Sequence, residues 1–218
     1  MSPEPAVSQQ LPRGRPRDPA FEERVFEAAV SLYAHGGLDS LSMGAIARRA
    51  RVGKASLYMR WPDKVELLRD ALEARIVLDT DLDTGDFRAD LRRLAGQMLD
   101  MLATEAGLAF MRRIVDATAR PDVPLRPEGG NPIVLAARQL VHNAVDRGDL
   151  PEDASPTVVM DMLFGAAMMH ASVTPPLLRS QERAGRERYL DQLTESVIAG
   201  ASRRAASVTE SDPDARIG

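Results

Sequence analysis

The chain has 218 residues, of which 44% are hydrophobic and 4% aromatic, and its formal net charge is −4. This hydrophobic content supports a packed core, and the scarcity of aromatic and β-branched runs favours helices over sheets. The absence of cysteine excludes disulfides, thiol nucleophiles and cysteine-based zinc sites. Without the apolar run of a signal peptide or an apolar stretch of about 18 residues, we expect a soluble, cytoplasmic protein that makes no membrane contact.

Basic residues are concentrated near the N-terminus. Residues 1–75 carry a net charge of +2, whereas the remainder carries −6. Residues 1–17 are rich in proline, serine and glutamine, and we predict that they form a disordered basic arm. Arg13, Arg15 and Arg17 lie there in a segment that resembles an AT-hook core, whose arginines enter the minor groove of A·T-rich DNA. A solvated basic linker is the alternative.

The first helix is predicted to begin at Asp18-Pro19, an N-cap followed by proline at the first helical position, and to end at Gly36-Gly37. Residues 41–68 then contain two short helical patterns that meet across a tight turn. The inward-facing positions of these patterns are Ile46, Ala47, Ala50, Val52 and Leu57. This is the hydrophobic skeleton of a helix-turn-helix, whose second helix lies in the major groove of DNA.

The remaining side chains of this segment are suited to contact DNA. Those predicted to donate to phosphate oxygens are Lys54, Ser56, Tyr58 and Lys64. Ser42 is expected to cap the first short helix, whose free N–H groups would face a phosphate. Base reading is expected to fall to the residues at the start of the second helix, Gly53, Lys54 and Ala55, because only short side chains let that backbone approach base edges. Met43 and Arg51 complete the predicted DNA-binding set.

Residues 20–70 resemble the DNA-binding domain of the TetR family of bacterial transcriptional repressors. The positions that carry the resemblance are Ser42, Ile46, Ala47, Val52, Leu57, Tyr58, Trp61, Pro62, Lys64, Leu67 and Leu68. Two positions depart from the family pattern. Arg51 stands where glycine is frequent, and a left-handed conformation costs such a residue about 1 kcal/mol. Gly53 replaces the usual serine as N-cap of the second helix and offers no side-chain acceptor.

The rest of the chain reads as amphipathic helices. A helix from Pro62 to Val77 is predicted to connect the head to the body, and residues 79–86 form an acidic interhelix loop rather than a calcium site. Further helices are expected from Phe87 onward, and the most apolar one spans 157–173. The predicted fold class is therefore all-α, with a three-helix head joined by a connecting helix to a larger helical-bundle body. The predicted divisions are 1–17, 18–64 for the head, 65–205 for the ligand-binding and dimerisation body, and a disordered tail at 206–218.

The body shows no catalytic constellation. Its histidines lack the spacing of a metal pair and no glycine-rich phosphate loop occurs, so we expect no enzyme activity, no cofactor and no metal. The family resemblance implies a ligand cavity inside the helical body, and clustered methionines suit an adaptable apolar site. The candidate ligand-binding residues are Met98, Met101, Phe110, Ile114, Leu135, His142 and Phe164. Ordinary core packing of the methionines, and a structural role for His142, are the alternatives.

The resemblance also implies a homodimer formed by the last two long helices, and two-fold symmetry would match a palindromic operator. The hypothesis from the sequence is thus a homodimeric repressor that binds double-stranded operator DNA and is released by a small apolar or amphipathic effector. Two other classes remain open. One is an architectural DNA binder with little sequence preference, and the other is an enzyme built on the helical body, for which the sequence supplies no nucleophile or base.

Overall fold

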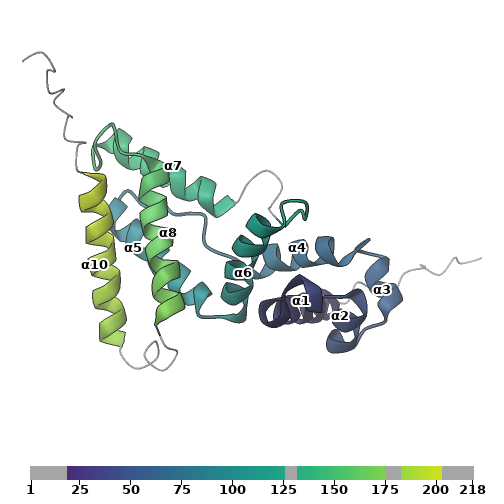
Figure 1. The fold of residues 1–218 in the computed structure, drawn as a ribbon. Coiled ribbons are helices and arrows are strands. Elements are labelled where there is room, and N and C mark those ends of the chain that lie inside the picture. The colour runs from purple at the N-terminus through teal and green to yellow at the C-terminus, as the bar shows by residue number, and fades with distance from the viewer. Residues whose placement is uncertain (1–18, 126–131, 175–182, 203–218) are drawn as a thin grey trace, which may run out of the picture.

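The computed structural model describes residues 19–125, 132–174 and 183–202, and every regular element in these ranges is an α-helix (Figure 1). The N-terminal helices are α1 (Pro19–Ser40), α2 (Met43–Ala50), α3 (Lys54–Tyr58) and α4 (Lys64–Arg75). The C-terminal helices are α5 (Phe87–Leu102), α6 (Glu105–Ala119), α7 (Pro132–Arg147), α8 (Pro156–Val173) and α10 (Arg183–Ala201). The predicted all-α class is confirmed. The arm at 1–17 and the tail at 206–218 lie outside the described residues.

The break predicted at the end of α1 is present at Gly37, whose φ of 67° and ψ of −169° are not helical. A positive φ strains any residue with a side chain, so glycine suits this position. The chain then makes one more turn up to Ser40, whose hydroxyl donates to the carbonyl oxygen of Gly37 at 3.0 Å. The break ends the long part of α1 and turns the chain toward α2.

The connecting helix α4 begins at Lys64, so the predicted start at Pro62 was wrong. Asp63 caps the helix, because its Oδ1 accepts from the backbone N–H groups of Val65 (2.7 Å) and Glu66 (3.0 Å). A carboxylate is a favourable group at a helix N-terminus. The helix ends at Arg75 rather than at Val77.

The head is built around one hydrophobic core to which α1, α2, α3 and α4 all contribute. Its largest fully buried side chains are Tyr33, Leu41, Ile46, Leu57, Leu67, Leu68, Leu72 and Leu125. Trp61 closes this core between α3 and α4, where its ring meets Phe26 edge-on at 5.7 Å and its Nε1 donates to Asp70 at 2.8 Å. Because residues as late as Leu72 belong to it, the head core extends beyond the predicted boundary at residue 64.

The body has a second core formed mainly by α5, α7, α8 and α10. α8 is its most apolar helix, and among the described residues it is long and apolar enough, by length and composition only, to cross a membrane; 28% of it is buried. One such helix is weak evidence for a membrane span, so it does not overturn the expectation from the sequence. α8 and α10 lie side by side at the end of the molecule farthest from the head (Figure 1).

Helix α6 lies between the two cores (Figure 1). Ala106, Ala109 and Ala117 pack with the head core, whereas Phe110 and Met111 pack against the body core. Its first turn lies directly on the end of α5, since a Cβ at Gly107 would come within 2.4 Å of the Leu102 Cα. α6 is thus in contact with both halves of the molecule, and any shift of this helix changes the packing of both.

Candidate nucleic-acid interface

The turn between α2 and α3 has the conformation expected from the sequence. The hydroxyl of Ser42 accepts from the backbone N–H of Ala45 at 3.1 Å, which confirms the predicted cap of α2. Arg51 is left-handed, with φ 55° and ψ 47°, and its N–H donates to the carbonyl oxygen of Arg48. Gly53 is the N-cap of α3 and makes no side-chain hydrogen bond. These residues fix the angle at which α3 leaves α2.

Helix α3 presents one outward face. Leu57 is fully buried beneath it, whereas Lys54, Ser56 and Tyr58 are exposed together with the small residues Gly53 and Ala55. The ammonium of Lys54 lies 5.6 Å from the centre of the Tyr58 ring, so the cation and the phenol belong to one surface. Short side chains at the start of α3 and donors further along it form the arrangement that a helix needs to approach a DNA groove.

Two predicted contact residues have other positions. Met43 is only 6% exposed and packs in the head core, so its side chain is not offered to DNA. Lys64 turns inward, where its Nζ donates to the carbonyl oxygens of Leu38 (2.7 Å) and Leu41 (2.9 Å). These carbonyls follow the break in α1, so Lys64 holds the start of α4 against the end of α1. This conformation supports a positioning role for Lys64 rather than the predicted phosphate contact.

Several exposed residues of the head were missed by the sequence analysis. Met59 is 86% exposed at the end of α3, and Arg48 and Arg49 are exposed in the last turn of α2. Arg60 stacks on the ring of Phe21 at 4.3 Å and donates to Glu22 at 2.7 Å. The basic doublet in α2 was a visible signal, whereas the exposure of Met59 depends on packing. Arg13, Arg15 and Arg17 lie outside the described residues.

Polar contacts join α1 of the head to α6. The buried hydroxyl of Tyr33 donates to Asp116 at 2.8 Å, and Arg120 donates to both carboxylate oxygens of Asp39 at 3.2 and 3.1 Å. Burial first, and then the hydrogen bond to Asp116, raises the pKa of Tyr33. Hydrogen bonds from Arg120 lower the pKa of Asp39. The head is therefore held to α6 by directional contacts as well as by apolar packing.

An open groove of about 540 Å³ lies at the same junction. Its lining residues are Ser31, Leu32, His35, Gly36, Ser40, Arg49 and Glu105. The polar groups engage one another, since Arg49 donates to the Ser31 hydroxyl at 2.8 Å and that hydroxyl donates to Glu105 at 3.3 Å. The groove contains none of the residues predicted to bind a ligand.

The predicted ligand-binding residues are only partly brought together. Met98 and Met101 are buried in the body core, and Phe110 and Phe164 are half-buried against it. The others do not face this core: Ile114 is 40% and Leu135 57% exposed, and His142 is also exposed. An exposed imidazole does not fit the predicted role of His142 as a polar anchor inside a cavity.

A tight helix pair with an exposed second helix, carried on an all-α chain, defines a helix-turn-helix DNA-binding protein. Comparison with known families agrees. The family "Bacterial regulatory proteins, tetR family" matches residues 25–71, and "Tetracyclin repressor-like, C-terminal domain" matches residues 81–197. The chain belongs to the TetR family of transcriptional regulators, a DNA-binding and generally non-enzymatic family.

Individual relatives extend over most of the chain. The HTH-type transcriptional regulator AqdR of Rhodococcus erythropolis is 30% identical over 164 residues, which cover 74% of this chain and 78% of AqdR. The HTH-type regulator YdeS of Bacillus subtilis is 26% identical over 207 residues, covering 93% of this chain and 99% of YdeS.

Solved structures share the fold. A TetR family transcription regulator from Marinobacter aquaeolei aligns with a TM-score of 0.64 at 21% identity, covering 86% of this chain and 98% of that protein. The fatty acid degradation regulator FadR from Bacillus halodurans aligns with a TM-score of 0.61 at 14% identity, covering 87% and 100%. At these identities the likeness demonstrates a common architecture.

Proposed function

We propose that the protein is a homodimeric, cytoplasmic repressor that binds a palindromic operator and is released from it by a small apolar or amphipathic effector. The observation that carries this proposal is the outward face of α3, where Lys54, Ser56 and Tyr58 surround a helix start made of small residues. In the proposed complex the small residues Gly53 and Ala55 let α3 approach base edges, while Lys54, Ser56 and Tyr58 donate to phosphates.

The N-terminus of α2 adds a second phosphate contact to the proposal. Ser42 satisfies one N–H of the first turn, and the remaining free N–H groups carry the positive end of the helix dipole. Arg48 adds exposed positive charge beside it, since its Nη1 would lie 3.6 Å from a Cβ at Gly44 in the first turn. These sequence-independent contacts would fix the register of the head on the duplex.

The outer face of α8 supports a homodimer. Val158, Met169 and Val173 are each more than half exposed, and they share one side of the helix with Gly165. A Cβ at Gly165 would meet nothing within 4 Å, which leaves room for another helix to approach closely. In the proposed dimer, α8 and α10 pair with the same helices of a second copy, as the family pattern implies, and the two heads face successive half-sites.

The ligand site is proposed along the edge of the body core next to α6. Phe110 and Met111 of α6 and Phe164 and Met168 of α8 each pack against this core, and all four side chains are half-buried. A ligand acts on DNA binding only through a difference in its affinity for two conformations. Because α6 also packs on the head, binding at this edge would favour one arrangement of the heads over another.

DNase footprinting of the DNA upstream of the protein's own gene tests the proposal, at physiological salt and with nonspecific competitor. The expected result is a protected palindrome with two major-groove contacts per half-site. Diffuse protection that competitor removes would instead indicate an architectural DNA binder. A specific-to-nonspecific affinity ratio near one would lead to the same conclusion.

The basic arm is proposed to enter the minor groove beside each half-site. Deletion of residues 1–17 removes Arg13, Arg15 and Arg17. The truncated protein is expected to lose affinity mainly for operators with A·T-rich flanks, because narrow A·T minor grooves attract arginine. Equal affinity of the full and truncated chains for A·T and G·C flanks would overturn this role.

A further inference from the structure

Two adjacent arginines of α6, Arg112 and Arg113, lie where the helix meets the head. Both side chains are half-buried, and within residues 19–125, 132–174 and 183–202 no hydrogen bond or ion pair engages either guanidinium. The Nε of Arg112 is buried without an acceptor, and its Nη1 lies so near Gly37 that a Cβ there would be 2.9 Å away. Arg113 lies over the ring of Phe110, at 5.3 Å from the centroid.

The nearby carboxylates are already engaged elsewhere. Asp116 accepts the hydroxyl hydrogen of Tyr33, and Asp39 is bound by Arg120 through two hydrogen bonds. Arginine offers five N–H donors in a rigid fork that matches a carboxylate or a phosphate. The junction therefore has more guanidinium N–H donors than acceptors, because both of these carboxylates already accept hydrogen bonds from other residues.

Arg113 is a partly desolvated cation. Burial lowers its pKa, against the opposing influence of Tyr33 and of Glu73 on α4. Glu73 is exposed and makes no ion pair with Arg113 in the described part of the chain, so it acts only at a distance. Withdrawing a cation from water without an acceptor is unfavourable, and an anion at this place would remove that cost.

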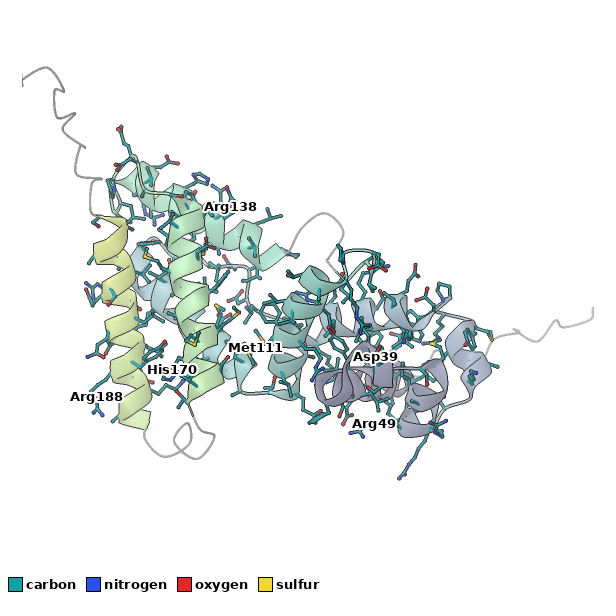
Figure 2. All side chains as sticks on the ribbon, in the orientation of Figure 1. Asp39, Arg49, Met111, Arg138, His170 and Arg188 are labelled. Carbon is teal, nitrogen blue, oxygen red and sulfur yellow. The ribbon has the colours of Figure 1, made fainter. Side chains whose placement is uncertain are left out.

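An apolar wall adjoins these donors. Phe110, which lies under the Arg113 guanidinium, packs with Met111 against the body core. The Met111 sulfur accepts from the Ser172 hydroxyl of α8 at 3.4 Å, and Figure 2 shows Met111 between α6 and α8. Methionine and phenylalanine side chains of this kind adapt to flexible apolar chains. Arg113 and Phe110, one turn apart, thus bring a cationic donor and an apolar surface onto one face of α6.

We propose that Arg112 and Arg113 bind the anionic headgroup of an amphipathic effector whose apolar tail lies against Phe110 and Met111. This inference rests on the proposed function, because it defines the chemical class of the effector that releases the repressor from DNA. A headgroup held there would lie where α6 packs against α1 and α4. The charge of the ligand would then alter the contacts between the head and the body.

Isothermal titration calorimetry of the full chain without DNA tests the proposal with three probes of equal tail length. Undecanoate and decyl phosphate supply the two anionic headgroups on ten-carbon tails, and decanol supplies the same tail without charge. Wild-type protein is expected to bind at least one anion about tenfold or more tighter than decanol, which is the effect of charge-assisted hydrogen bonds. Failure of both anions to exceed decanol, or to bind at all, would overturn the proposal.

Variants separate the headgroup from the tail. Arg113→Gln is expected to weaken anion binding at least about tenfold and leave decanol binding unchanged, and Arg112→Gln is expected to act in the same direction. Arg138→Gln removes an exposed arginine of α7 (Figure 2) and is the matched control, expected to change neither affinity. Phe110→Ala is expected to weaken all three probes. Anion affinity that survives in both Arg112→Gln and Arg113→Gln would refute the headgroup site.

A conservative variant guards against misfolding. Arg113→Lys keeps the charge but not the fork, so its anion affinity is expected to fall between those of wild type and Arg113→Gln. Circular dichroism and thermal unfolding verify that each variant is folded. Because calorimetry uses no DNA, a missing anion site leaves the operator-binding proposal intact, and a failed footprint leaves the calorimetric result interpretable.

Discussion

Replacing Tyr33 with phenylalanine tests the polar contact that joins the head to α6. The tyrosine is fully buried and its hydroxyl donates to Asp116 at 2.8 Å. The variant keeps the ring but leaves the carboxylate without this donor. Hydrogen bonds to charged groups contribute about 1.5–3 kcal/mol, and half-buried Asp116 regains some hydration, so we expect the free energy of unfolding to fall by about 1.5–2 kcal/mol.

Equilibrium denaturation of the full chain by guanidinium chloride, followed by circular dichroism, measures this loss. Tyr189→Phe is the matched control, because its hydroxyl donates to the neutral carbonyl of Ala166 at 3.2 Å from a half-buried position. There the expected loss is about 0.5–1 kcal/mol. Equal losses for the two variants would refute the special contribution of the Tyr33–Asp116 contact.

The same contact predicts a dependence of stability on pH. Burial and the hydrogen bond to Asp116 raise the pKa of Tyr33 above its ordinary value of 10.0, so the folded chain holds the phenol proton more tightly than the unfolded chain. The resulting stability is complete below pH 10.0 and is lost as the pH rises toward the folded-state pKa. Wild type should therefore lose stability more steeply than Tyr33→Phe above about pH 10, whereas parallel curves would contradict this reasoning.

Three further variants test the head and the dimer face. Lys54→Ala is expected to weaken binding to operator and to unrelated DNA alike, by about tenfold, and to lower the slope of log affinity against log salt concentration by about one unit. Anisotropy titrations that show weaker binding to the operator only would contradict a phosphate contact. Lys64→Ala removes the donor to two carbonyls, so its midpoint of thermal unfolding should fall by about 3–6 °C while the salt dependence of DNA binding stays unchanged. A weaker salt dependence at an unchanged midpoint would instead support the phosphate contact. Met169→Asp places a charge on the outer face of α8 and should convert dimer to monomer in sedimentation equilibrium, whereas a dimer of unchanged stability would exclude that face.

The head was largely predictable because its signals are local. The spacing of Ile46, Ala47 and Leu57 defines which side of each short helix is buried, and Ser42 and Arg51 occupy positions whose capping and turn chemistry depends on a few neighbours. The inward turn of Lys64 was not predictable, because its acceptors belong to the end of α1. A lysine near a helix start looks the same in sequence whether it faces water or a distant carbonyl.

The body was predictable as a set of helices but not as a site. Helical periodicity places Met98 and Phe110 on apolar faces, yet it does not say which neighbouring helix those faces meet. His142 illustrates the limit, since only the packing of α7 determines that its ring is exposed. The two guanidinium groups on α6 gave no sequence signal either, because an arginine becomes noteworthy only when its surroundings lack an acceptor.

The proposed recognition helix α3 has five residues, and its glycine cap gives it no side-chain support. A helix of this length does not persist alone in water, so α3 keeps its shape only while Leu57 remains packed in the head core. In a genetic screen for lost operator control, substitutions at buried positions such as Ile46 should therefore be recovered beside those that face the groove. Operator DNA, which binds only the folded head, should in turn partly rescue the milder ones.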